Sequence, residues 1–215
     1  MKEAFAMNRI FLKIASIAAA VAVLFSLTAC NPEKRSGAAQ YDKSYYITKY
    51  GGDLDSNLSV FPDSVEEGRV ALFESSFGEG LFDTDGYMIL EYRCDAEQIA
   101  AEEERLGGIA FTIKNHDGKT FTNHVMDDEK SYPYPAYITN DGFGSTYEYA
   151  LIDRGGNRII YIYAAYVMPD GFPCKEYLKT DRSAYKADSL QAFTVYNHSF
   201  DGGQSWMEFD DVTDH

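Results

Sequence analysis

Clusters of carboxylates are the most frequent chemistry-bearing feature of this sequence. They lie at residues 53–55, 83–86, 127–129 and 210–214. Clustered oxygen ligands suit calcium, and two carboxyl groups can act as acid and base in glycoside hydrolysis. The segment that begins at Asp83 matches only part of an EF-hand loop, because its twelfth position is Cys94 and not a glutamate. The pattern therefore predicts no metal site and selects no catalytic pair.

Histidines and nucleophile motifs add no active site. The four histidines are His116, His124, His198 and His215, and none has the spacing of a metal-binding pair. The sequence contains neither a glycine-rich phosphate loop nor the Gly-x-Ser-x-Gly nucleophile turn. We therefore expect no catalytic residue, no metal and no cofactor.

Cys30 is the residue whose surroundings indicate a chemical modification. Lys2, Arg9 and Lys13 precede an uncharged run over residues 14–29, and Cys30 ends that run. Basic residues followed by a short apolar segment are typical of a secretory signal peptide. The run is also shorter than the about 20 residues of a membrane-spanning helix.

Leu27, Thr28, Ala29 and Cys30 resemble the lipobox of bacterial lipoproteins, Leu-x-Ala/Gly-Cys. The resemblance implies that a diacylglyceryl group is attached to the Cys30 thiol and that a peptidase cuts between Ala29 and Cys30. Residues 1–29 are then a signal peptide, and the mature protein is lipid-anchored on the extracytoplasmic side of the cell membrane. The alternative is an ordinary secretory signal in which Cys30 is incidental.

The charge of the mature chain indicates what holds it at the membrane. Residues 1–29 carry three bases and one acid, so the rest keeps 16 bases and 33 acids, a net charge of −17. Such a domain is repelled by anionic lipid and nucleic acid over about 8 Å. Two acyl chains anchor stably, at about 0.8 kcal/mol per buried CH₂. We expect the lipid to hold the protein, and no nucleic-acid partner.

Residues 199–206, SFDGGQSW, resemble the Asp-box of sialidases and other propeller proteins. The matching residues are Ser199, Asp201, Gly203, Ser205 and Trp206. The resemblance implies a hairpin turn in which the Asp201 carboxylate bonds turn amides and Trp206 packs beneath. One copy in a chain too short for six four-stranded blades predicts a structural turn and not sialidase activity.

Cys94 and Cys174 are the other two cysteines. An exported protein can keep a disulfide, and closing so long a loop would stabilise the fold by several kcal/mol on the chain-entropy model. The alternative is two buried free thiols that act as small hydrophobic side chains. Sequence does not decide between the two.

The mature chain divides into a tether and one domain. Residues 30–44 are polar, carry proline and glycine and show no periodicity, which predicts a lipidated cysteine followed by a flexible tether. Residues 45–215 suffice for a single β-rich globular domain. All but one of the 17 tyrosines lie in that stretch, the exception being Tyr41.

Strand signals dominate the domain. They cover residues 69–77, 87–94, 108–114, 119–126, 134–139, 145–153, 157–167, 190–199 and 204–209. The one clear helix spans 95–108, with Asp95 and Gln98 placed as a capping box. We therefore predict an α+β fold, a mostly antiparallel sheet of hairpins with one main helix packed on a face. The alternative is an all-β sandwich with a helical insertion.

Five tyrosines alternate along two of these strands: Tyr147, Tyr149, Tyr161, Tyr163 and Tyr166. Tyrosine packs well in sheets, and it also supplies rigid contact surface for sugars and proteins. Packing within the sheet is the simpler interpretation, and a ligand or partner surface is the alternative.

Residues 87–106 and 147–167 are similar to a group of small lipoproteins of gut Gram-positive bacteria in which a strand runs into an acidic helix and a tyrosine-rich hairpin follows. This resemblance implies location and fold and no chemistry. Anchor, tether and acidic aromatic domain together favour a binding or interaction module at the cell surface, with a protein or glycan ligand. An extracytoplasmic hydrolase acting on glycan is the alternative.

Overall fold

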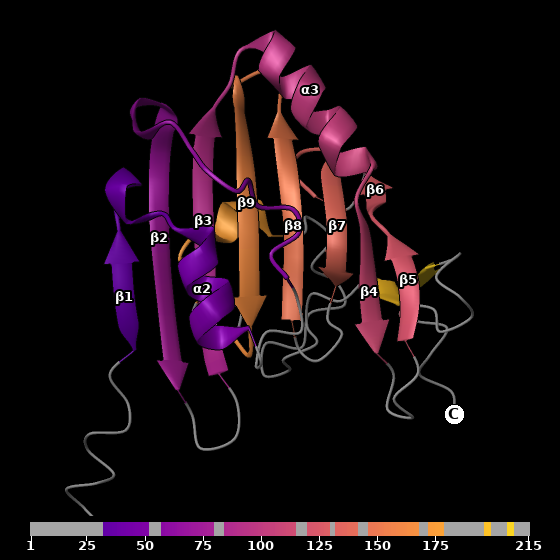
Figure 1. Ribbon diagram of the computed structural model, residues 1–215. Coiled ribbons are helices and arrows are strands. Elements are labelled where there is room, and N and C mark those ends of the chain that lie inside the picture. The colour runs from indigo at the N-terminus through magenta and orange to yellow at the C-terminus, as the bar shows by residue number, and fades with distance from the viewer. Residues whose placement is uncertain are drawn as a thin grey trace, which may run out of the picture.

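A computed structural model describes the parts of the chain that form the sheet and its coverings. The described residues are 32–51, 57–79, 84–114, 120–129, 132–141, 146–167, 172–178, 196–198 and 206–208. They form a seven-stranded antiparallel sheet with the order β1-β2-β3-β9-β8-β7-β6, two separate two-stranded sheets, and two α-helices. The fold is therefore broadly α+β, as predicted (Figure 1).

The strands of the large sheet are β1 (Glu33–Ser36), β2 (Val70–Glu79), β3 (Thr84–Arg93), β6 (Met126–Asp128), β7 (Ala136–Asp141), β8 (Thr146–Asp153) and β9 (Arg158–Ala165). The smaller sheets pair β4 (Ala110–Lys114) with β5 (Thr120–His124), and β10 (Tyr196–His198) with β11 (Trp206–Glu208). The helices are α2 (Lys43–Tyr50) and α3 (Ala96–Gly107), with 3-10 turns η1 (Ala38–Gln40), η2 (Glu67–Arg69) and η5 (Lys175–Tyr177).

The β8–β9 hairpin forms where the sequence predicted it. Asp153 ends β8, and its carboxylate accepts a hydrogen bond from the Gly156 amide at 2.7 Å. Asn157 adopts a left-handed conformation, with φ at 52°, which asparagine tolerates better than most residues. These local features close the turn and set the register, in which Asp153 pairs with Arg158.

Strand β9 is central, fourth in the order of seven, and is buried on both faces as predicted. Alternate side chains point to opposite faces of a strand. We define face A by Leu90, Tyr161 and Tyr163, and face B by Ile89 and Ile162. Each face carries its own buried hydrophobic cluster, so the sheet is an inner layer covered on both sides.

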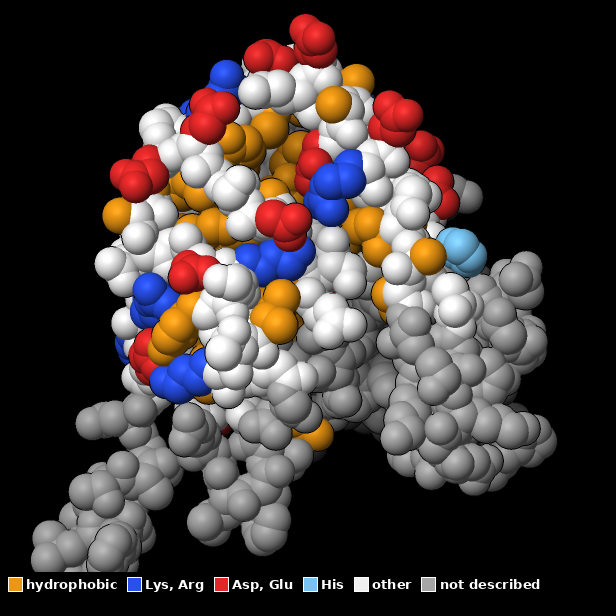
Figure 2. Space-filling model, viewed as in Figure 1, with side chains coloured by type: hydrophobic (Ala, Val, Ile, Leu, Met, Phe, Trp, Pro, Cys, Tyr) orange, Lys and Arg blue, Asp and Glu red, His pale blue; other side chains and the backbone are white. Residues whose placement is uncertain are grey.

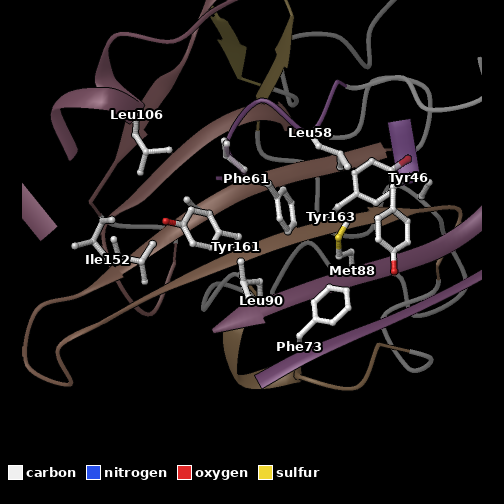
Figure 3. Close-up of a cluster of buried hydrophobic side chains, with 14 of the residues drawn as sticks. Tyr46, Leu58, Phe61, Phe73, Met88, Leu90, Leu106, Ile152, Tyr161 and Tyr163 are labelled. Atoms are coloured by element: carbon white, nitrogen blue, oxygen red, sulfur yellow. The ribbon is translucent and has the colours of Figure 1, made fainter. Parts of the chain in front are cut away.

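Face A is covered by α2 and by a segment that we call the strap, residues 57–63. Tyr46 of α2 and Leu106 of α3 are almost wholly buried in the same cluster. Figure 3 shows strap residues Leu58 and Phe61 among the sheet side chains, and the Phe61 ring lies 5.8 Å from that of Tyr161. In Figure 1 the strap and α2 lie in front of the sheet.

Helix α3 begins as the sequence predicted. The Asp95 side chain accepts a hydrogen bond from the Gln98 amide, and the Gln98 side chain accepts one from the Asp95 amide, which completes the capping box. Ile99 and Leu106 are its buried residues. Four of the other residues of the helix are glutamates, and these polar side chains keep that part of the helix at the surface.

The tether predicted over residues 30–44 is wrong from Glu33 onward. Residues Glu33–Ser36 pair with β2 as the edge strand β1, in the register Glu33 with Phe77. Asp42 then caps α2 by accepting a hydrogen bond from the Tyr45 amide. The strand was missed because its side chains are polar and its formation depends on the neighbouring backbone. Short, charged strands are typical of protected sheet edges.

Candidate functional site

The signal and lipobox residues Ala29 and Cys30 lie outside the described residues, as do Ser199, Asp201, Gly203 and Ser205 of the Asp-box-like turn. Trp206 begins β11 and pairs with His198 of β10. The two strands that flank the turn therefore form the hairpin that the sequence predicted. The role of the turn itself stays a prediction.

Cys94 and Cys174 are free thiols, so the disulfide considered from the sequence is not formed. Cys94 belongs to the cluster on face A, whereas Cys174 packs against the cluster on face B. The sheet lies between them, which separates the two sulfur atoms. Burial raises the pKa of each thiol to about 11, so neither is an activated nucleophile.

The tyrosines of the β8–β9 hairpin divide between the two faces. Tyr161 and Tyr163 are buried on face A, and Tyr147 and Tyr149 on face B. Within the described residues, Ile47 is the only large hydrophobic side chain that is exposed, at 36%. Packing within the sheet thus accounts for these four tyrosines.

A small cavity lies on face B among three tyrosines, Tyr132, Tyr147 and Tyr149, and Phe172 and Leu178 also line it. Its free volume is about 10 Å³, which is room for about one water molecule. A sugar ring does not fit the cavity as these residues form it.

The acidic residues that the structure describes do not come together as a metal site. Within the part of the chain that the structure describes, no group of three or more histidine, cysteine, aspartate or glutamate side chains could hold an ion. Asp85 is exposed in β3. Asp127 is exposed in β6, the edge strand that is four places away from β3 in the sheet order. Residues 53–55 and 210–214 lie outside the described ranges.

Glu148 is the buried acid that the sequence analysis missed. It lies in β8 on face A, is 1% exposed, and accepts a hydrogen bond from the Val60 amide at 2.7 Å. Burial raises its pKa to about 7, although hydrogen bonds from the Val60 amide and the Thr139 hydroxyl lower it. A glutamate between tyrosines in a strand with apolar residues on both faces is the signal that could have revealed it.

Glu148 of the sheet accepts a hydrogen bond from the strap backbone. Three further side chains donate hydrogen bonds to strap carbonyls. The Arg105 guanidinium of α3 donates to the Val60 carbonyl at 2.5 Å and to the Ser59 carbonyl at 3.3 Å. Lys43 of α2 donates to the Phe61 carbonyl at 2.9 Å, and Tyr41 donates to the carbonyl of the next residue, Pro62. The strap backbone thus finds partners without belonging to a sheet or helix.

Face B has its own polar network around Arg158. Its guanidinium lies 2.8 Å from Asp153 and 3.0 Å from Glu91, and it also donates to the Tyr177 hydroxyl at 3.1 Å. Tyr177 in turn donates to Glu91 at 2.6 Å. Burial raises the pKa of Asp153, but bonds from Arg158 and the Gly156 amide outweigh it and hold that pKa below its ordinary value. This network ties η5 to the sheet.

Comparisons with protein-family models, with curated proteins and with solved structures gave no match. No helix among the described residues is both long and apolar enough to cross a bilayer.

Proposed function

We propose that this protein is a bacterial lipoprotein, cut between Ala29 and Cys30 and held by lipid on Cys30 at the extracytoplasmic side of the cell membrane. The observation that carries the proposal is the order of features in the sequence. Lys2, Arg9 and Lys13 precede an uncharged run over residues 14–29, and Ala29 and Cys30 stand at its end. The first described strand, β1, begins at Glu33, three residues after Cys30.

Mass spectrometry and fractionation test this anchor. We expect the mature protein to begin at a diacylated Cys30 and to fractionate with membranes, and Cys30→Ala to lose both the modification and the membrane association. Ser36→Ala, a change at an exposed residue six positions further on, is the matched control and leaves both intact. Recovery of the Cys30→Ala variant in the membrane fraction would contradict lipid anchoring.

We further propose that the domain is a binding or interaction module that the anchor presents at the cell surface. The proposal is supported by three buried or half-buried acids of the described residues, which hold the fold together. Glu148 holds the strap, Glu102 accepts from Tyr161 at 2.8 Å, and Glu91 joins Arg158 to Tyr177. Their hydrogen-bonding capacity serves packing, which suits a domain that displays a surface.

The partner is a protein or a glycan, and the strong negative charge disfavours nucleic acid. A glycan array probed with the soluble form that begins at Asn31 tests the glycan class. Release of reducing ends from the same glycans is the control measurement. Binding without release supports the module, whereas release of reducing ends would favour the hydrolase.

Two finer features of the fold belong to this proposal. We propose that α3 packs on face A, supported by the burial of Ile99 and Leu106 and by the Tyr161–Glu102 hydrogen bond. We also propose that the Asp-box-like residues form a structural turn, supported by the pairing of β10 with β11.

A further inference from the structure

The start of β1 leaves almost no free chain between the proposed lipid and the folded sheet. Only Asn31 and Pro32 separate Cys30 from Glu33, and the three fully extended steps from Cys30 to Glu33 span at most about 11 Å. A chain that short cannot let the domain rotate freely above the bilayer. The end of the sheet at which β1 begins therefore has to stay close to the lipid surface.

The register of the sheet shows which residues share that end. Glu33 pairs with Phe77, Phe77 with Gly86, and Gly86 with Ala165, so one row crosses four neighbouring strands. We call this row the anchor end. It is the lower end of β1, β2, β3 and β9 in Figure 1, and the strand β1 leads away from it.

The opposite end of the same strands leads into α3. Arg93 pairs with Arg158 at that end, seven residues along β3 from Gly86, which corresponds to about 23 Å. Helix α3 begins at Ala96, three residues after Arg93, and Figure 1 shows it over the upper ends of β8 and β7. The helix is therefore the part of the sheet assembly that lies far from the anchor.

The described segments at the two ends differ in charge, although each end carries both signs, with exposed Asp85 near the anchor end and exposed Arg93 near α3. Residues 32–51, which form β1, η1 and α2, carry four bases and two acids, in a mature chain of net charge −17. Residues 95–107, the cap and body of α3, carry five acids and one base. Figure 2 shows mostly acidic side chains along the top and upper right, over α3, and basic side chains mixed with acidic ones at lower left, over β1 and α2.

We propose that the domain stands on the membrane in one orientation, with the anchor end against an anionic bilayer and α3 directed away from it. This inference rests on the proposed lipidation of Cys30. Chain reach keeps the anchor end near the lipid, and an anionic surface attracts the base-rich end while it repels the acidic helix.

Labels at two exposed positions distinguish the proposed orientation from the reverse one. Asp85 pairs with Gly78 near the anchor end, and Ala101 lies on α3. The lipidated full-length variants Asp85→Cys and Ala101→Cys would be purified from membranes, labelled with a thiol-reactive fluorophore and reconstituted into anionic vesicles with a headgroup quencher. Wild type labelled in parallel reports the background from Cys94 and Cys174.

We expect the quenching constant at Asp85 to exceed that at Ala101 by at least about threefold, because the two ends of the sheet lie about 23 Å apart. Equal quenching, or stronger quenching at Ala101, would overturn the orientation while leaving the anchor intact. Protein that fails to join vesicles and carries an unmodified Cys30 would overturn the anchor itself. If either label disturbs the circular dichroism spectrum, Lys34→Cys and Gly155→Cys, both at exposed positions, make the same comparison.

Discussion

Replacing Glu148 by glutamine isolates the energetic effect of one buried carboxyl group. Glutamine has nearly the same shape, and its amide oxygen can still accept the hydrogen bond that Val60 donates at 2.7 Å. The substitution replaces a carboxyl group that can lose a proton by an amide that cannot titrate. Any change in the pH dependence of stability therefore reports the titration of this group.

The magnitude follows from the pKa. Burial raises the pKa of Glu148 from its ordinary value of 4.5 to about 7 in the folded protein. A raised pKa means that the folded state binds the proton more tightly than the unfolded state does. The stabilisation is fully present below pH 4.5 and is lost as the pH rises through about 7. At about 1.36 kcal/mol for each pH unit of that interval, the loss is about 3 kcal/mol.

Urea unfolding of the soluble form at several pH values measures this loss. We expect the free energy of unfolding of Glu148→Gln minus that of wild type to be about 3 kcal/mol larger at about pH 8 than at pH 4.5, because only wild type loses this stabilisation as the pH rises. Glu104→Gln, at an exposed position on α3, is the matched control and should follow wild type at every pH.

Parallel pH profiles for Glu148→Gln and wild type would refute this reasoning. They would mean that Glu148 does not hold a proton more tightly in the folded state, and that its burial beneath the strap is relieved by water. The comparison does not depend on the other carboxylates, because they titrate equally in both proteins.

The remaining predictions concern the core and the thiols. Phe61→Ala should destabilise the domain by about 3–5 kcal/mol, because this strap ring is wholly buried, whereas Ile47→Ala at an exposed position should change stability by less than about 0.5 kcal/mol. Thermal unfolding of both variants measures this difference in stability. If Phe61→Ala destabilised the domain as little as Ile47→Ala, the strap would not pack on face A. Because Cys94 and Cys174 are free, a reductant should leave the unfolding midpoint unchanged; a lower midpoint would reveal a disulfide.

Features that depend on neighbours along the chain could be predicted from the sequence. The capping box of α3 needs only Asp95 and Gln98, three residues apart, and the structure confirms it. The β2–β3 and β8–β9 hairpins needed only two apolar runs joined by turn-forming residues, and both are present. The double burial of β9 followed from apolar residues at both alternating sets of positions.

Features that depend on residues far apart in the sequence could not be predicted from the sequence. β1 has no apolar pattern and becomes a strand because the backbone of β2 pairs with it, 38 to 44 positions later. Residues Glu91 and Ile160 become neighbours only because β9 joins the sheet beside β3. The separation of Cys94 from Cys174 likewise depends on which face of the finished sheet each segment covers.

The amino-acid sequence by itself determined the local elements of this protein, since backbone hydrogen bonds, caps and turns act over a few residues. It also determined the charge of the chain and the apolar run that ends at Cys30. Only the tertiary structure decided that Glu148 lies beneath the strap and that the sheet begins three residues after the proposed lipid. Burial is a property of the assembled layers, and a residue acquires it from partners that the local sequence does not contain.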